Sequence, residues 1–236
     1  MPLYARPELL TKEDHGHLGL RNLDHPFAFA RNARSVPLMV SEFRSAQRFC
    51  PVVFTDRENP FPVAALGILE NRNLFIDDQG RWLVPGYIPA YLRCYPFALA
   101  STTADRFALV VDRDAEMVSD TPDVPFFEGN DPSPGIQERI ELCRTYKAEK
   151  ERTEAFCSTL KRLDLLVEQE ANNEIDGQVR PIAQYAVVDR DRLMKLDAET
   201  INGLFRDGSL GAIMAHLFSL DGFDELVRLR LLRASR

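Results

Sequence analysis

The chain has 236 residues, of which 45% are hydrophobic and 28% charged, and its formal net charge is -7. This is the composition of an ordinary globular domain, and it argues against disorder, collagen-like repeats and small disulfide scaffolds. The acidic balance disfavours a nucleic-acid partner, because binding to phosphate backbones normally depends on clustered Lys and Arg. A chain of this length can bury one large core or two small ones, and we predict a single domain over residues 1–236.

The cysteines and the N-terminus show no metal-binding or targeting pattern. The four cysteines form no C-x-x-C pair and have no histidine at zinc-ligand spacing, so we expect reduced, partly buried thiols and no cofactor. They are Cys50, Cys94, Cys143 and Cys157. Charged residues interrupt residues 1–20, and no window approaches the ~20 apolar residues of a membrane helix. We therefore expect a cytoplasmic protein without membrane insertion.

The N-terminal half is predicted to be rich in strands. Residues 1–24 are polar with no clear period, whereas the alternating residues 26–30 (PFAFA) favour a strand. After Pro37, apolar residues recur at separations of three and four, which predicts a helix that ends at Pro51.

Four further apolar runs predict strands, because they are short and bounded by turn residues. They are residues 52–55, 63–69, 74–76 and 107–112. Residues 77–80 (DDQG) are typical of a hairpin turn. Pro89 can open a short helix that stops before Pro96. Residues 114–135 carry many prolines and glycines and are predicted to be a loop that links two halves.

The C-terminal half is predicted to be mainly helical. Apolar residues at three and four predict a long helix over about 136–168. Residues 177–182 and 184–189 predict a hairpin, Asp189 or Asp191 can cap a short helix, and a last amphipathic helix is expected through Leu229.

The predicted elements favour an α+β class, with an antiparallel sheet from the N-terminal half packed with helices mainly from the C-terminal half. Strands cluster within about 25–112 and helices dominate within 136–236, on either side of the loop 114–135. Segregation of this kind is typical of α+β proteins and not of alternating βαβ units.

Two neighbouring stretches resemble the signature of the SapC family. They are NLFID at 73–77, which is followed by GRW at 80–82, and YIPAYLRCYPF at 87–97. The similarity extends over about residues 17–229. The chain departs from the family pattern at Cys50, where a tyrosine is common, and at Cys94, where an arginine is common. The second departure puts in doubt any role that needs two adjacent guanidinium groups there.

The SapC family is named after a surface-layer locus and has no agreed enzymatic activity. The resemblance therefore implies no particular reaction. Relatives are often encoded near flavin-dependent tryptophan-halogenase-like proteins, cupin-like proteins and outer-membrane receptors. These neighbouring genes imply an accessory role in the uptake or modification of a small compound or peptide.

The leading candidate site is an aromatic stretch that contains an arginine. Amphipathic rings beside a guanidinium group make good surfaces for ligands or partner chains, although the same rings can simply join a helix to a sheet. The candidate residues are Trp82, Tyr87, Tyr91, Arg93 and Tyr95. The three tyrosines recur every four residues and could line one helical face.

Other constellations favour structural readings. The histidines and carboxylates of residues 13–25 match no metal-ligand spacing, and His15 and His17 are expected to be exposed at a mobile terminus. His216 and Ser219 could suggest a base and a nucleophile, but no G-x-S-x-G motif is present, and a core histidine or an interface contact is favoured. Neither a metal site nor a catalytic residue is predicted.

These observations favour a non-enzymatic binding or accessory protein with a protein or small-molecule partner. One alternative is an enzyme whose acid–base groups come from distant positions, with His17, Asp77, Arg93 and His216 as candidates. Another is a surface-layer-associated protein, as the family name implies.

Overall fold

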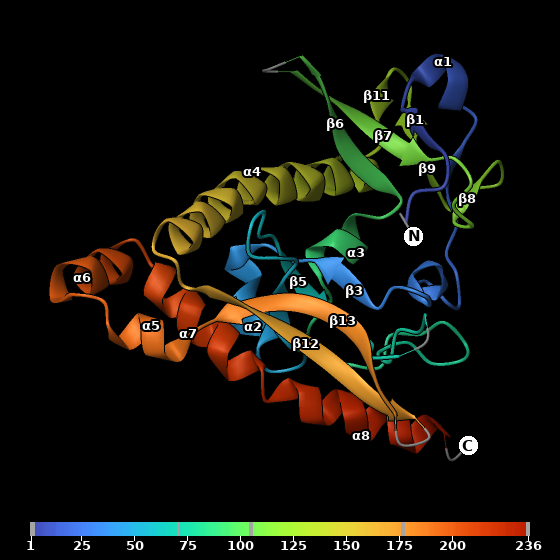
Figure 1. The fold of residues 1–236 in the computed structure, drawn as a ribbon. Coiled ribbons are helices and arrows are strands. Elements are labelled where there is room, and N and C mark those ends of the chain that lie inside the picture. The colour runs from blue at the N-terminus through green and yellow to red at the C-terminus, as the bar shows by residue number, and fades with distance from the viewer. Residues whose placement is uncertain (1–2, 70, 104–105, 176–177, 235–236) are drawn as a thin grey trace. The chain divides into compact units, whose positions relative to one another are not determined.

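The computed structural model describes residues 3–69, 71–103, 106–175 and 178–234 (Figure 1). Contacts between residues divide the chain into two compact units. Unit 1 comprises residues 1–33 and 75–148, and unit 2 comprises residues 34–74 and 149–236. Each unit is therefore assembled from two separate segments of the chain.

Among the described residues, unit 1 contains small antiparallel sheets and short helices. Its strands are β1 (Pro7–Leu9), β2 (Gly19–Leu20), β6 (Phe97–Thr103), β7 (Arg106–Asp112), β8 (Val118–Ser119), β9 (Val124–Pro125), β10 (Phe127–Glu128) and β11 (Asp131–Pro132). They pair in the orders β1-β7-β6, β8-β2-β9 and β10-β11. Its helices are α1 (Lys12–His15), the 3₁₀ helix η1 (Ala28–Ala30), α3 (Ala90–Cys94) and the beginning of the long helix α4 (Pro134–Arg162).

The core of unit 1 lies where α3 and α4 meet these sheets. Phe97 and Phe126 are fully buried and pack edge to face, with ring centroids 5.6 Å apart. Ile136 and Cys143 lie seven residues apart on α4, two turns along one face, so the helix presents both to the same core.

Unit 2 is built around an antiparallel sheet with the strand order β12-β13-β4-β5-β3. The strands are β3 (Ser35–Pro37), β4 (Val52–Phe54), β5 (Pro62–Ala65), β12 (Leu166–Ile175) and β13 (Gln178–Val188). The helices are η2 (Val40–Glu42), α2 (Phe43–Ala46), α5 (Arg190–Met194), α6 (Ala198–Arg206), α7 (Ser209–Ser219), α8 (Gly222–Ala234) and the remainder of α4. None of the described helices in either unit has the length and apolar composition needed to cross a bilayer.

The α+β class is confirmed, since antiparallel sheets and several helices make up both units. The predicted strands at 52–55, 63–69 and 107–112 correspond to β4, β5 and β7. The sheet of unit 2, however, also takes β12 and β13 from the C-terminal half. The predicted loop 114–135 holds the short strands β8 to β11, all within unit 1.

The strand predicted at 26–30 was wrong. Ala28–Ala30 forms the 3₁₀ helix η1, in which the amides of Ala30 and Arg31 donate to carbonyls three residues earlier, at 3.0 and 3.1 Å. The apolar residues alternate because two rings find different partners: Phe27 lies against Trp82, whereas Phe29 stacks on Tyr95.

The long helix was predicted to end at about residue 168, but α4 ends at Arg162. Asp164 adopts a left-handed conformation with φ of 50°, and the Leu165 amide donates to the Leu160 carbonyl at 3.0 Å. This is the bonding pattern of a Schellman cap, which frees the chain to begin β12 at Leu166. The last predicted helix is likewise divided into α7 and α8.

The single domain remains a prediction, which we base on chain connectivity: the backbone passes between the two units three times. Neither unit is a contiguous segment, so we expect both to unfold in one cooperative transition. In a urea titration, the fluorescence of Trp82, the only tryptophan and part of unit 1, should give the same midpoint as far-UV circular dichroism. Two separate midpoints would contradict the prediction.

Candidate functional site

Trp82 lies in an aromatic cluster of unit 1. Its ring stacks on Phe75 at 5.8 Å between centroids and lies 5.8 Å from Phe27. The indole Nε1 donates a hydrogen bond of 3.0 Å to the carbonyl oxygen of Tyr87. Trp82 thus uses both its ring and its N–H group in internal contacts, and it holds the segment that leads into α3.

The three tyrosines do not share a helical face, contrary to the prediction. Helix α3 covers only Ala90–Cys94, so Tyr87 precedes it, and Tyr95 follows it in an extended conformation with ψ of 136°. Tyr91 lies 6.1 Å from the ring of Tyr146. Tyr95 is buried, stacks on Phe29 at 4.0 Å and donates its hydroxyl to Asp112 at 2.9 Å. Burial and this hydrogen bond raise the pKa of Tyr95.

Arg93 and Tyr95 line a cavity of about 800 Å³ in unit 1. The cavity lies between the segment 20–29, the end of α3 and the beginning of α4. Its apolar lining includes the rings of Phe27 and Phe29 and the side chains of Leu92 and Leu142. Its volume and mixed lining are those of a small-molecule site.

The cavity carries a local excess of positive charge in an acidic protein. Arg21, Arg93 and Arg139 line it together with a single acidic residue, Glu138. Arg139 donates to the Arg93 carbonyl oxygen at 3.4 Å, and Arg93 uses its Nε to bind the carbonyl oxygen of Ile88 at 3.1 Å. Within the described part of the chain, neither Arg93 nor Arg139 has a carboxylate partner. Both guanidinium groups therefore keep most of their hydrogen-bonding capacity for an anion.

Sequence reasoning identified Arg93 and Tyr95 but missed Arg21 and Arg139. Arg21 pairs with Glu116 at 3.8 Å. Arg139 stands in a helix of alternating charges, where each charge is typically solvated, and only the fold brings it to the carbonyl of a residue 46 positions earlier. Among the five candidates, the structure thus brings two to the cavity and leaves Trp82, Tyr87 and Tyr91 outside its lining.

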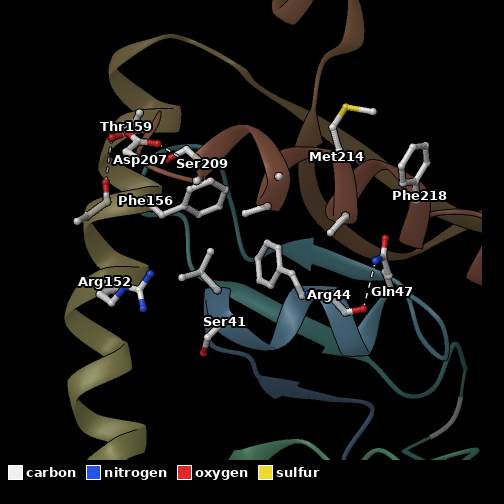
Figure 2. A pocket seen from close by; sticks show the side chains of 17 residues that line it. Ser41, Arg44, Gln47, Arg152, Phe156, Thr159, Asp207, Ser209, Met214 and Phe218 are labelled. Atoms are coloured by element: carbon white, nitrogen blue, oxygen red, sulfur yellow. Dashed lines mark hydrogen bonds between the residues drawn. The ribbon is translucent and has the colours of Figure 1, made fainter. Parts of the chain in front are cut away.

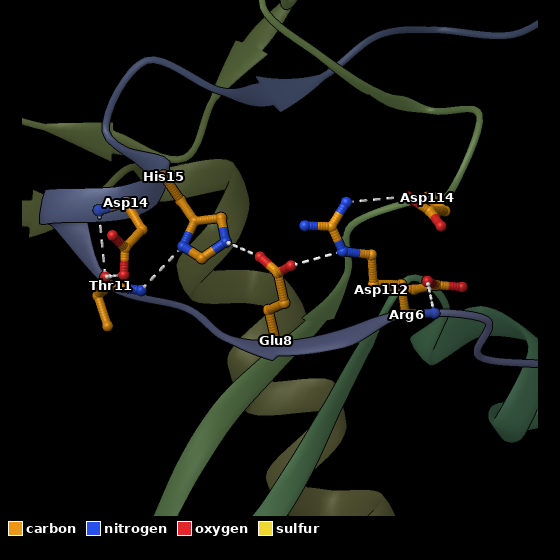
Figure 3. A network of polar contacts seen from close by, with 7 residues as sticks. All are labelled: Arg6, Glu8, Thr11, Asp14, His15, Asp112 and Asp114. Carbon is orange, nitrogen blue, oxygen red and sulfur yellow. Dashed lines mark hydrogen bonds and ion pairs between the residues drawn. The ribbon is translucent and has the colours of Figure 1, made fainter.

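The N-terminal histidine segment is ordered, so the expectation of an exposed, mobile terminus was wrong for His15. His15 is only 2% exposed, and its Nε2 lies 3.2 Å from the carboxylate of Glu8, while its Nδ1 accepts from the Thr11 amide at 3.3 Å. Glu8 also pairs with Arg6, whose Nε lies 2.8 Å from the carboxylate; Figure 3 shows both contacts of Glu8. The chain of contacts fixes β1 beside α1. No three His, Cys, Asp or Glu side chains of the described residues come together as metal ligands.

His216 and Ser219 are core residues of unit 2. The His216 Nδ1–H donates to the Val52 carbonyl at 2.7 Å, and Nε2 accepts from the Val188 amide at 3.0 Å. The Ser219 hydroxyl donates instead to the His216 carbonyl, at 2.6 Å. The two side chains therefore form no nucleophile–base pair, and the core reading of His216 is confirmed.

Asp77 and His17, two other residues of the enzyme hypothesis, do not line the cavity that contains Arg93. Asp77 accepts from the amides of Gln79 and Arg81 at 2.9 and 2.8 Å, which is turn chemistry. These bonds, chiefly that from the Arg81 amide, lower the pKa of Asp77. His17 is exposed and does not line the cavity that contains Arg93. The four residues thus share no described cavity.

The four cysteines are free and buried, as expected of reduced thiols. Burial raises the pKa of Cys50 and of Cys157 to about 12, so both stay protonated and unreactive at neutral pH. The pKa of Cys143 is lowered, first because it shares a hydrogen bond with Cys94 and also because Arg139 lies nearby.

A second cavity, of about 530 Å³, lies in unit 2 between α2, α4 and α7. Phe156, labelled in Figure 2, lines it together with Phe43, and the centroids of the two rings lie 5.9 Å apart. Several of its polar side chains already have internal partners: Arg152 pairs with Glu149 at 3.1 Å, and the Thr159 hydroxyl donates to a backbone carbonyl at 3.1 Å. Among the described residues, the cavity of unit 2 has one arginine without a carboxylate partner, Arg44, whereas the cavity of unit 1 has two, so the cavity of unit 1 is the stronger candidate for binding an anion.

Comparison with known proteins gives a family. The family model SapC matches residues 10–226. No curated protein and no solved structure matches the chain. The match includes the resembling stretches at 73–82 and 87–97 and covers most of the sequence, so the chain belongs to the SapC family.

Proposed function

We propose that this SapC-family protein is a non-enzymatic binding protein, which holds a small anionic compound or peptide with an apolar body in the cavity of unit 1. The observation that carries the proposal is the pair of unpaired guanidinium groups, Arg93 and Arg139, beside an apolar and aromatic lining. Arginine binds carboxylate and phosphate oxygens through two parallel N–H donors, and the rings accept the apolar part of the ligand.

The cellular role that we propose is an accessory one in the uptake or modification of that compound, in the bacterial cytoplasm. The four free thiols support a reducing compartment, because disulfides form mainly in oxidising ones. Cell fractionation that places the protein in the envelope would favour the surface-layer alternative.

Loss of either arginine should weaken the binding of an acidic probe. We expect 3-phenylpropionate to bind by isothermal titration calorimetry more tightly than the uncharged 3-phenylpropan-1-ol. Arg93→Gln and Arg139→Gln should each raise the Kd of the acid about tenfold, since a charged hydrogen bond contributes roughly 1.5 kcal/mol. Neither change should affect the alcohol.

Arg144→Gln is the matched control, because Arg144 lies on α4 like Arg139, is exposed and does not line the cavity. It should leave both affinities unchanged. Equal affinity for the acid and the alcohol, or equal effects of all three substitutions, would contradict the proposed site. Native mass spectrometry of the protein purified gently from its own host then identifies the natural ligand.

A further inference from the structure

The acidic residue of the cavity constrains the ligand further. Gly135, Glu138, Arg139 and Leu142 line the cavity from one face of α4, with the spacing of three and four that a helix requires. Glu138 is exposed and has no basic partner among the described residues. The cavity therefore presents one unpaired negative charge beside the two unpaired positive charges.

A simple anion is not the best ligand for this arrangement. Its carboxylate would bind Arg93 and Arg139 but would lie close to the like charge of Glu138, which disfavours binding. A ligand that also carries an ammonium group converts that repulsion into attraction. Each charge at the edge of the cavity then has an opposite partner, and the apolar body lies against Phe27, Phe29 and Leu92.

We propose that the ligand is a zwitterion with an apolar body, such as an α-amino acid with an apolar side chain, whose ammonium group binds Glu138 while its carboxylate binds Arg93 and Arg139. This inference rests on the proposed function and names the class of ligand for the same cavity. Glu138 is then the residue that selects an amino acid over the corresponding acid.

Three probes with the same phenyl ring test the contributions of the carboxylate and of the ammonium group separately. L-Phenylalanine carries both groups, 3-phenylpropionate lacks the amine, and 2-phenylethylamine lacks the carboxylate. By calorimetry, we expect L-phenylalanine to bind about tenfold more tightly than either of the other two probes, because it makes one additional charged hydrogen bond. The fluorescence of Trp82 gives a second readout, because its ring lies 5.8 Å from Phe27 in the cavity lining.

Glu138→Gln tests the assignment directly. It should raise the Kd of L-phenylalanine about tenfold and leave that of 3-phenylpropionate unchanged or lower, because a repulsive charge has been removed. Arg139→Gln should raise both. Glu141→Gln, an exposed change on the same helix outside the cavity, should alter neither.

The outcomes distinguish this inference from the proposed function. If 3-phenylpropionate binds through Arg139 but Glu138→Gln has no effect on L-phenylalanine, the zwitterion assignment is overturned and the anion site stands. If no carboxylate probe binds, or if Arg139→Gln changes nothing, both fail.

Discussion

Replacing His216 with Phe should destabilise the protein by about 3 kcal/mol at neutral pH, because two buried backbone groups lose their partners. β13 and β4 pair at Ala186 and Phe54, so the antiparallel register places Val188 opposite Val52. The imidazole of His216 bridges these two residues, accepting from the Val188 amide and donating to the Val52 carbonyl. A phenyl ring fills the same space but can satisfy neither group.

The same residue should make stability depend on pH. Burial lowers the pKa of His216 to about 4, from an ordinary value of 6.5. The folded state thus favours the neutral ring, and the stabilisation is fully present above pH 6.5. It is lost as the pH falls from 6.5 towards 4, by roughly 3 kcal/mol in all, because the unfolded chain takes up the proton first.

Urea titrations between pH 4 and 8 check both expectations. The difference in unfolding free energy between wild type and His216→Phe should shrink as the pH falls, and carboxylates that titrate in both proteins cancel from this difference. His216→Gln does not titrate but keeps a donor and an acceptor, so it should destabilise less than Phe and show the same loss of pH dependence. A difference that stays constant with pH would contradict the assignment.

The predicted fold was most accurate where a local pattern decides the structure. The spacing of three and four in α4 and the β-branched run in β7 can be recognised in the local sequence, and both elements were predicted. β6 was missed because its sequence, FALASTT, follows a proline and has small residues where a strand usually has branched ones. Its stability comes from pairing with β7, which the local pattern does not reveal.

The candidate site was predicted only in part, for a similar reason. The sequence indicated Arg93 and Tyr95 because aromatic residues and an arginine lie close together along the chain. Arg21, Glu138 and Arg139 come from two distant segments, and each looks like an ordinary solvated charge in its own context. Similarly, His216 could be assigned to a core, but its partners lie 28 and 164 residues away.

Asp112 had no signal in the sequence beyond the end of a strand, yet it organises the N-terminus of unit 1. It is 1% exposed. Its Oδ1 accepts from the Arg6 amide at 2.8 Å, and its Oδ2 accepts from the Ala5 amide at 3.0 Å and from the Tyr95 hydroxyl at 2.9 Å. Figure 3 shows this carboxylate next to β1, so it joins the N-terminal strand to the residue that forms a wall of the cavity.

Asp112→Ala should therefore lower the free energy of unfolding by about 4 kcal/mol, since the buried Tyr95 hydroxyl and two partly buried backbone amides lose their charged acceptor at once. Asp112→Asn keeps one carbonyl oxygen and should cost about half as much, and Tyr95→Phe removes a single hydrogen bond and should cost about 1 kcal/mol. Asp114→Ala, which loses only an exposed ion pair of 3.6 Å to Arg6, should change stability by less than about 0.5 kcal/mol.

Urea unfolding followed by Trp82 fluorescence measures this order of stabilities. Equal stabilities of the Asp112 and Asp114 variants would show that the carboxylate does not anchor the N-terminus. If the order holds, Asp112→Ala should also weaken 3-phenylpropionate binding, because Tyr95, which lines the cavity, then loses the bond that fixes its side chain.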